Sequence, residues 1–228
     1  MYILHIETST LVCSVAISRD DQVMGWEDRG EAMNHAAVLA PMIASQLAKQ
    51  GLTASDLGAV SISSGPGSYT GLRVGSSVAK AFAYSLNIPM MAIPTLEALN
   101  DAVIRIAGPG SHVFPMIDAR RDEVYGSLFD PNSKVVWSDH AVKINEDFIV
   151  EHLANLPRVL CCGDGAFKIK PYLSSYPNLV LREDVVCSAR HLVSPAWFLL
   201  NQQKTEDPLH FIPRYVKPPN ITQPRKTA

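Results

Sequence analysis

Ser64-Gly-Pro-Gly-Ser-Tyr-Thr-Gly-Leu-Arg-Val-Gly75 is the stretch that decides the fold of this 228-residue chain. It follows a β-favouring run at 59–64 and precedes a helix that we expect to extend to about Leu86. A strand, a glycine turn and a helix N-terminus together gather unpaired backbone N–H groups, which can hold a phosphate. A purely structural turn is the alternative, because the Gly-Lys-Ser/Thr of a P-loop and the pattern Gly-x-Gly-x-x-Gly are both missing.

The opening of the chain predicts a β-meander. Runs at 2–7 and 11–18 flank Thr8-Ser9-Thr10, and a third run at 22–26 follows the Asp20-Asp21 turn. The hydroxyl groups on the first turn either bond their own backbone or present donors to an anion.

Two predicted helices each carry a stripe of small residues at four-residue intervals. In the helix at 35–50, which Asn34 can cap, the stripe is Ala36, Ala40, Ala44 and Ala48. In the helix after the glycine loop it is Gly71, Gly75, Ala79 and Ala83, and a helical glycine costs about 1 kcal/mol relative to alanine unless close packing compensates. We expect these stripes to meet each other or a second polypeptide, whereas Val74, Val78 and Phe82 suit the sheet.

Composition excludes several classes of protein. Hydrophobic residues make up 47% and charged residues 18%, as in globular domains, and no apolar run reaches eighteen residues. The net charge of −2 argues against autonomous nucleic-acid binding. The N-terminus has no basic segment of a signal peptide, and the cysteines at 13, 161, 162 and 187 lack zinc-site spacing, so we expect a cytoplasmic protein with reduced thiols.

The second half of the chain predicts further strands at 113–117, 124–129, 135–142 and 159–162, and a helix at about 194–203. The charged segment 118–123 between the first two is typical of a solvated turn with mutual salt bridges; an interface or structural role for Asp118, Arg120 and Tyr125 is the alternative. Beyond Asp207 the chain is rich in proline, with Arg214, Lys217, Arg225 and Lys226 making it basic. This tail either lies extended across the body or contacts tRNA or a partner.

The glycine stretch resembles, almost letter for letter, the signature of the bacterial TsaB family, also called YeaZ. Further similar segments are 6–10, 13–17, 89–99, 118–125 and 213–216, so the resemblance spans nearly the whole chain and is weakest between about 129 and 195. It implies the α/β fold of actin-like ATPases (sugar kinase, Hsp70, actin and ribonuclease H-like), with two subdomains that each contain a mixed sheet flanked by helices. We expect these at 1–105 and 106–228, with the helix at 194–203 packing back on the first.

The resemblance also implies a function. TsaB proteins serve with TsaD and TsaE in making threonylcarbamoyl-adenosine beside the anticodon of tRNA, with TsaD as the catalyst. The expected partners are therefore a TsaD-type catalytic subunit, a TsaE-type ATPase and, when alone, a second copy of this chain; tRNA is met only through the complex, and no membrane is involved. The partner interface is assigned to Ala36, Ala40, Ala44, Gly71, Gly75, Ala79 and Ala83, and the role of the family-motif residues Arg73, Asp118, Arg120, Glu123 and Tyr125 is left open.

Two departures separate this chain from a catalyst. TsaD-type enzymes bind a metal through His-x-x-x-His, but Thr95 and Leu99 stand at the matching positions, and no two of the seven histidines lie four apart. We therefore predict no metal and no catalytic residue. Glu7 stands where ATPases of this fold have aspartate, and its extra methylene is expected to fill the space of a hydrated magnesium ion. Weak ATP or ADP contact is expected at most, at Glu7, Thr8, Ser9, Thr10, Gly65, Gly67, Ser68 and Thr70.

Two rival functions remain. A stand-alone actin-fold ATPase or M22-type metallopeptidase needs a metal centre or an activated nucleophile, and the sequence assembles neither. A stand-alone tRNA-binding module conflicts with the charge balance and lacks an aromatic platform among basic residues.

Overall fold

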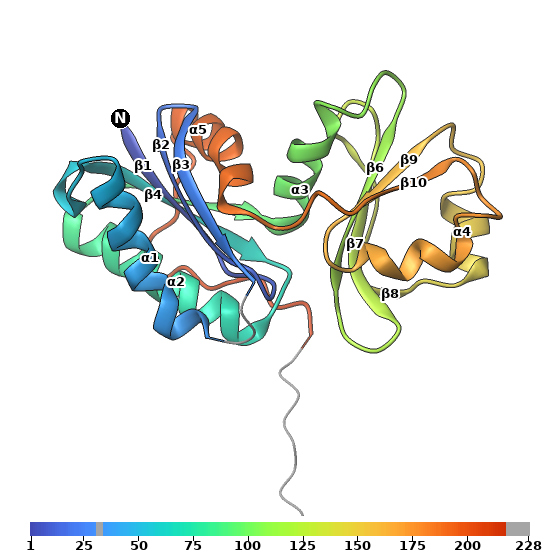
Figure 1. The fold of residues 1–228 in the computed structure, drawn as a ribbon, viewed down its shortest axis with the longest axis horizontal. Helices are drawn as coiled ribbons and strands as arrows, with labels where there is room; N and C mark the ends of the chain where they lie inside the picture. The colour runs from blue at the N-terminus through green and yellow to red at the C-terminus, as the bar shows by residue number, and fades with distance from the viewer. Residues whose placement is uncertain (31–33, 218–228) are drawn as a thin grey trace, which may run out of the picture.

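The computed structural model describes residues 1–30 and 34–217, and consists of two five-stranded mixed sheets, each flanked by helices (Figure 1). The predicted α/β architecture with two mixed sheets is confirmed. The end of the proline-rich tail, including Arg225 and Lys226, lies outside the described residues.

The first sheet has the strand order β3-β2-β1-β4-β5. Its strands are β1 (Tyr2–Glu7), β2 (Cys13–Arg19), β3 (Gln22–Arg29), β4 (Leu57–Gly65) and β5 (Met90–Pro94). The first three form the antiparallel meander that the sequence predicts, because short polar turns join them. β4 and β5 run parallel to β1, each reached through a helical connection.

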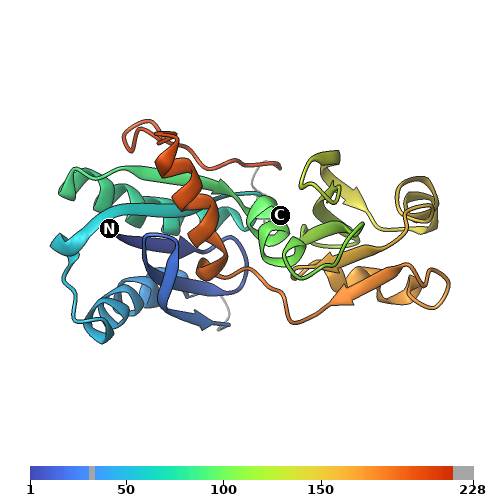
Figure 2. The same cartoon turned by 90° about the horizontal axis from the view of Figure 1, so that it is seen from above.

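Helices cover both faces of this sheet. On one face lie α1 (His35–Lys49), the short 3₁₀ turn η1 (Ala54–Asp56) that follows it, and α2 (Tyr69–Leu86). On the other lie η3 (Ala189–Leu192) and α5 (Val193–Asn201), whose Leu192 and Ala196 pack on Ile3 and Met91 (Figure 2). The predicted final helix therefore packs on the first sheet.

The second sheet repeats the topology of the first, with the order β10-β9-β6-β7-β8. Its strands are β6 (His112–Asp118), β7 (Glu123–Phe129), β8 (Val135–Lys143), β9 (Val159–Cys162) and β10 (Leu179–Arg182), and its helices are α4 (Glu146–His152) and η2 (Ala166–Tyr172). As in the first sheet, an antiparallel meander is extended by two parallel strands. Each subdomain is thus a separate layered unit with its own core.

Helix α3 (Thr95–Ile104) lies between the two sheets. Leu96, Leu99 and Val103 pack into the core beside the second sheet, while Ala98 packs against the first. Because one helix contributes to two cores, it is the structural joint of the molecule. Among the described residues, no helix combines the length and apolar character needed to cross a membrane.

Candidate functional site

The glycine loop and the first hairpin turn touch each other at the carboxyl ends of the adjacent strands β1 and β4. The Ser68 N–H donates to the Ser9 carbonyl at 2.6 Å, and Ser68 Oγ accepts from the Gly71 N–H at 3.3 Å, which caps α2. A Cβ on Gly67 would lie 2.6 Å from Ser9 Cβ, so only glycine permits this approach. The two loops therefore form one wall.

Glu7 is buried at the carboxyl end of β1. Its fully buried carboxylate accepts from the Ser9 N–H at 2.6 Å and from the Ser63 hydroxyl at 2.9 Å, within the first subdomain. Desolvation raises the pKa of Glu7, and these hydrogen bonds partly offset the rise. These hydrogen bonds hold the carboxylate at the end of β1, and the expectation that its extra methylene fills the space of a hydrated magnesium ion stays a prediction.

A cavity of about 410 Å³ separates the two subdomains. Ser9, Thr10, Gly67, Ser68 and Thr70 line it, as predicted for a phosphate-loop-like wall. Ser9 Oγ is buried and has no hydrogen-bond partner, which leaves a free hydroxyl at this wall.

The other predicted members of this wall do not reach the cavity. The Thr8 hydroxyl donates to the Gly71 carbonyl at 2.9 Å and ties β1 to α2. Gly65 adopts φ +106°, and a Cβ there would lie 2.5 Å from the carbonyl oxygen of Arg214. Glu7, Thr8 and Gly65 thus support the loops instead of lining the cavity.

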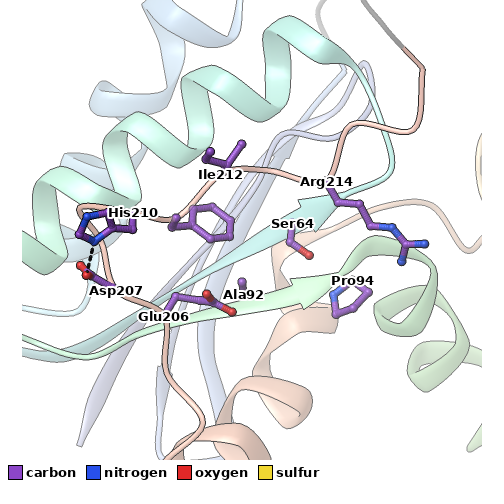
Figure 3. A pocket seen from close by; sticks show the side chains of 9 residues that line it. Ser64, Ala92, Pro94, Glu206, Asp207, His210, Ile212 and Arg214 are labelled. Carbon is purple, nitrogen blue, oxygen red and sulfur yellow. Dashed lines mark hydrogen bonds and ion pairs between the residues drawn. The ribbon is translucent and has the colours of Figure 1, made fainter.

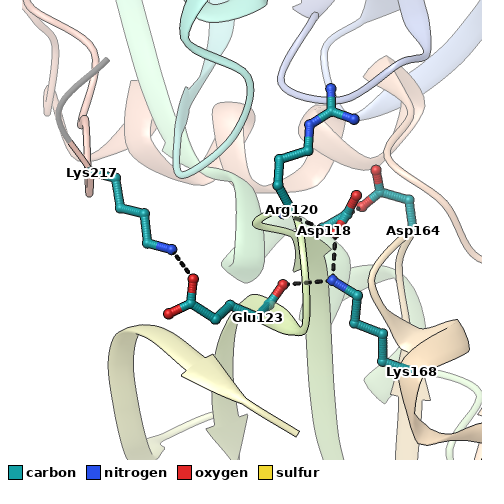
Figure 4. A network of polar contacts seen from close by, with 6 residues as sticks. All are labelled: Asp118, Arg120, Glu123, Asp164, Lys168 and Lys217. Atoms are coloured by element: carbon teal, nitrogen blue, oxygen red, sulfur yellow. Dashed lines mark hydrogen bonds and ion pairs between the residues drawn. The ribbon is translucent and has the colours of Figure 1, made fainter. Parts of the chain in front are cut away.

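The second subdomain supplies the opposite wall through Asp118, Arg120, Tyr125 and Asp164. Asp118 pairs with Lys168 at 2.6 Å, and the same ammonium donates to the Glu123 carbonyl at 2.7 Å (Figure 4). The prediction of mutual salt bridges within 118–123 is wrong. Asp118 pairs with Lys168 and Glu123 pairs with Lys217, and both lysines come from distant parts of the chain.

Asp164 lies in the turn between Gly163 and Gly165. It accepts from the Asp118 N–H at 3.1 Å. Burial raises the pKa of Asp164, the hydrogen bond from the Asp118 N–H opposes this rise, and the nearby charges of Asp118 and Arg120 raise and lower it further. This wall therefore carries both signs of charge. The Arg120 guanidinium lies on the cavity side of the Asp118 and Asp164 carboxylates (Figure 4).

The end of the described chain forms the third wall. The Tyr215 ring contacts the Tyr69 ring in a tilted arrangement, with centroids 4.7 Å apart and an angle of 46° between the planes, and the Arg73 guanidinium lies 4.2 Å from the Tyr69 ring centroid. Lys217 pairs with Glu123 of the second subdomain (Figure 4). This segment thus contacts three residues whose roles were left open, namely Arg73, Glu123 and Tyr125.

Sequence reasoning missed Asp164, Lys168, Tyr215 and Lys217 as members of this site. Asp164 had a local signal, because an aspartate between two glycines marks a turn after a strand. No local signal identifies the other three, since each meets its partner across roughly fifty or more residues.

A second, smaller cavity of about 380 Å³ lies beside β5 in the first subdomain. Ala92, Pro94 and Ser64 form its floor, and the residues after α5 form its rim, where His210 and Asp207 pair at 2.6 Å (Figure 3). Arg214 closes one end (Figure 3). This hollow is a consequence of the path of the chain end over the sheet.

The interface prediction fails for the stripe on α2. Gly71, Gly75, Ala79 and Ala83 are all buried against the chain's own first sheet. A Cβ on Gly71 would overlap the Thr8 carbonyl oxygen, and one on Gly75 would lie 2.9 Å from Ile62 Cδ1. Val74, Val78 and Phe82, expected on the sheet, are partly buried and pack against the core of the first subdomain.

On α1 the stripe faces outward. Ala36, Ala40, Ala44 and Ala48 are exposed, while Leu39, Ile43 and Leu47 pack into the core. Ala36 and Val74 line the same cavity, so the two helices start side by side. The two small-residue stripes therefore do not meet each other.

The residues that separate this chain from a catalyst in sequence lie in buried positions. Thr95 and Leu99, at the positions of the metal-binding histidines of TsaD-type enzymes, are buried. Within residues 1–30 and 34–217, no three His, Cys, Asp or Glu side chains are grouped so that they could hold a metal ion. Burial raises the pKa of Cys13 to about 11 and that of Cys161 to about 12, so neither is a ready nucleophile.

Sequence comparisons agree with this arrangement. A model of the TsaD family, described as tRNA N6-adenosine threonylcarbamoyltransferase, matches residues 29–155, which is more than half of the chain. The TsaB protein of Bacillus subtilis, a tRNA threonylcarbamoyladenosine biosynthesis protein, is 36% identical over 133 residues, covering 57% of this chain and 55% of that protein. TsaB of Escherichia coli is 27% identical over 221 residues, 95% of each chain. The chain belongs to the TsaB (YeaZ) family.

Two solved structures have the same fold as this chain. A Pseudomonas aeruginosa protein described as similar to the peptidase YeaZ superposes with a TM-score of 0.78 at 25% identity, covering 95% of this chain and 99% of that one. The activator of 2-hydroxyisocaproyl-CoA dehydratase from Clostridium difficile, solved with ADPNP, gives a TM-score of 0.55 at 8% identity over 91% of this chain and 99% of that one, which shows a shared fold alone. The predicted actin-like ATPase fold is confirmed.

Proposed function

We propose that this chain is a non-catalytic subunit in tRNA threonylcarbamoyladenosine biosynthesis, which pairs with a TsaD-type catalytic subunit in the cytoplasm and, in its absence, with a second copy of itself. The TsaB relatives are named for this pathway. The observation that carries the pairing is the exposed alanine stripe of α1 beside the open flank of α2.

This surface has the chemistry of a helix-docking face. Alanines project only a methyl group, so the backbone of a partner helix can come close over the length of the stripe. α1 carries no charged side chain before Lys49, and α2 carries only Arg73 and Lys80. A partner helix therefore has little charge to desolvate on this face. Val74, Val78 and Phe82 add apolar area along its edge.

The residues of the site favour a non-catalytic role for this chain rather than a catalytic one. Thr95 and Leu99 replace the imidazoles that a TsaD-type enzyme uses, and both are buried within the joint between the subdomains. We therefore assign transfer chemistry to the partner, with tRNA reached through the complex and a TsaE-type ATPase acting on the assembled pair. We expect the cavity to admit ATP or ADP at most weakly, because Glu7 carries one methylene more than the aspartate of ATPases of this fold.

The test uses exposed alanines of the docking face. Replacing Ala40 and Ala44 together with arginine places two charged side chains in the expected interface without touching the core. We expect loss of co-purification with the TsaD-type enzyme, a monomer in sedimentation of the chain alone, and loss of tRNA modification in a reconstituted reaction.

Ala54→Arg is the matched control, because Ala54 is an exposed alanine in the η1 turn, outside the docking face. It should leave pairing and modification unchanged. Unimpaired pairing of the Ala40→Arg, Ala44→Arg variant would contradict the assigned surface. Modification of tRNA by the enzyme without this chain would contradict the proposed function.

A further inference from the structure

The last described residues, 206–217, form a strap that is fastened first to the first subdomain. The Glu206 N–H donates to the Met90 carbonyl at 2.8 Å, and the Arg214 N–H donates to the Ser64 carbonyl at 2.7 Å. Between these points Phe211 is buried in the first core, and its carbonyl accepts from Lys80 at 3.1 Å. The strap passes directly over Gly65, where a Cβ would overlap the Arg214 carbonyl oxygen. Glycine at this position therefore leaves room for the strap.

After Arg214 the strap crosses to the second subdomain along the cavity (Figure 1). The Tyr215 ring contacts the Tyr69 ring of α2. Val216 packs on the core beside the second sheet, and Lys217 pairs with Glu123 and lies 5.9 Å from the Tyr125 ring centroid. Three consecutive residues therefore touch both subdomains and line the cavity between them.

The strap differs in kind from the other links between the subdomains. The chain itself crosses twice, through α3 and through the segment 183–188 that leads from β10 to η3. The strap adds a third link that consists only of non-covalent contacts. Its ion pair is open to solvent, with Lys217 35% and Glu123 41% exposed, so this contact is weak enough to break reversibly.

We propose that residues 215–217 are a latch that holds the two subdomains closed over the cavity. Its release lets the subdomains rotate about α3, because that helix belongs to both cores and the latch lies at the opposite, cavity side of the joint. Opening separates the wall of Ser9 and Ser68 from the wall of Asp118 and Arg120. The latch thus controls whether a ligand or a partner's side chain can enter between them.

The experiment measures the distance between the subdomains in the full-length protein. Ser55→Cys and Asn132→Cys place spin labels on exposed turns of the first and second subdomains, and the four native cysteines are buried. Electron–electron double resonance then reports the distribution of distances. In this background, Tyr215→Ala with Lys217→Ala removes the contact between the two tyrosine rings, the cation–π contact and the ion pair of the latch.

We expect a second, longer distance in this variant, with the ratio of open to closed molecules raised about tenfold by the combined loss of these contacts. Tyr84→Ala with Lys134→Ala is the control, because both are exposed residues outside the strap, and it should keep the original distribution. An unchanged distribution in the latch variant, with circular dichroism showing it folded, would overturn the proposal. A shift of equal size in the control would overturn it as well.

Discussion

Helices α1 and α2 lie side by side and carry the same pattern, a small residue at every fourth position, yet they use it in opposite ways. On α2 the pattern faces inward, where Gly71 and Gly75 let the helix backbone rest on Thr8 and Ile62. On α1 it faces outward, where the alanines cover nothing. The stripe alone therefore does not tell which side a helix buries.

The remaining faces of the two helices explain the difference. α1 has a complete aliphatic stripe, Leu39, Ile43 and Leu47, whose burial is worth more than that of alanine methyl groups. α2 buries Leu72 but must also pass directly over the β1–β2 turn, and only glycine provides the room there. Glycine thus marks approach to the chain's own backbone, whereas alanine leaves the choice open.

The largest effect is expected on the inward stripe. Gly75→Leu places a Cβ 2.9 Å from Ile62 Cδ1, overlaps the Thr8 hydroxyl and adds three further carbons. We expect a loss of at least about 5 kcal/mol in the free energy of unfolding, enough to unfold a protein of ordinary stability. Urea denaturation followed by circular dichroism measures it. A folded Gly75→Leu protein of normal stability would show that α2 does not rest on the sheet.

The second effect concerns the sheet face away from these helices. There His5 is fully buried between the hydroxyls of Ser61 at 2.7 Å and Ser18 at 2.8 Å, and burial lowers its pKa from 6.5 to about 3. The unfolded chain protonates below pH 6.5 while the folded chain stays neutral, so stability is full above that pH and is lost as the pH falls toward 3. From pH 7.5 to pH 4 this amounts to about 3 kcal/mol.

Urea denaturation at several pH values tests this assignment. His5→Gln should flatten the acid limb, because glutamine fills a similar space and does not titrate. Glu7 has the opposite sign, because its pKa is raised and its contribution is lost as the pH rises above 4.5. An acid limb that persists in His5→Gln would refute the role of this histidine.

The third effect tests whether α2 shares in the docking face. Ala81 is exposed on the flank of α2 that includes Val74 and Val78. Ala81→Arg should weaken pairing with the TsaD-type subunit about tenfold, less than the double arginine variant of α1, because it lies at the edge of the alanine stripe. Calorimetric titration of the two proteins measures this change. Full affinity would confine the interface to α1.

The smallest effect completes the comparison of the two stripes. Ala44→Leu on α1 makes the same kind of enlargement as Gly75→Leu on α2, but its side chain enters solvent. We expect the free energy of unfolding of the isolated chain to change by no more than about 0.5 kcal/mol. Thermal and urea denaturation at pH 7.5 provide the measurement. A loss of several kcal/mol would mean that the alanine stripe is buried in the folded monomer.

Local signals sufficed for much of the fold and for half of the cavity. The meander, the glycine loop and the capped start of α2 follow from alternation, turn residues and Ser68, all within a few positions in sequence. Ser9 and Thr10 were predicted because hydroxyls cluster on a turn next to a glycine loop. The second wall of the cavity was not predicted. Its ion pair between Asp118 and Lys168 forms only because η2 packs against β6.

By itself, the sequence determined the first meander, the strand, loop and helix around the glycine stretch, the family and the loops that face the cavity, because each depends on residues close together in the chain. Tertiary structure alone decided which stripe is buried, which donors the Glu7 carboxylate accepts from and how the strap joins the subdomains. The physical reason is that burial and charge pairing are settled among groups brought together from distant positions, where steric room and available partners, not residue type, select the contact.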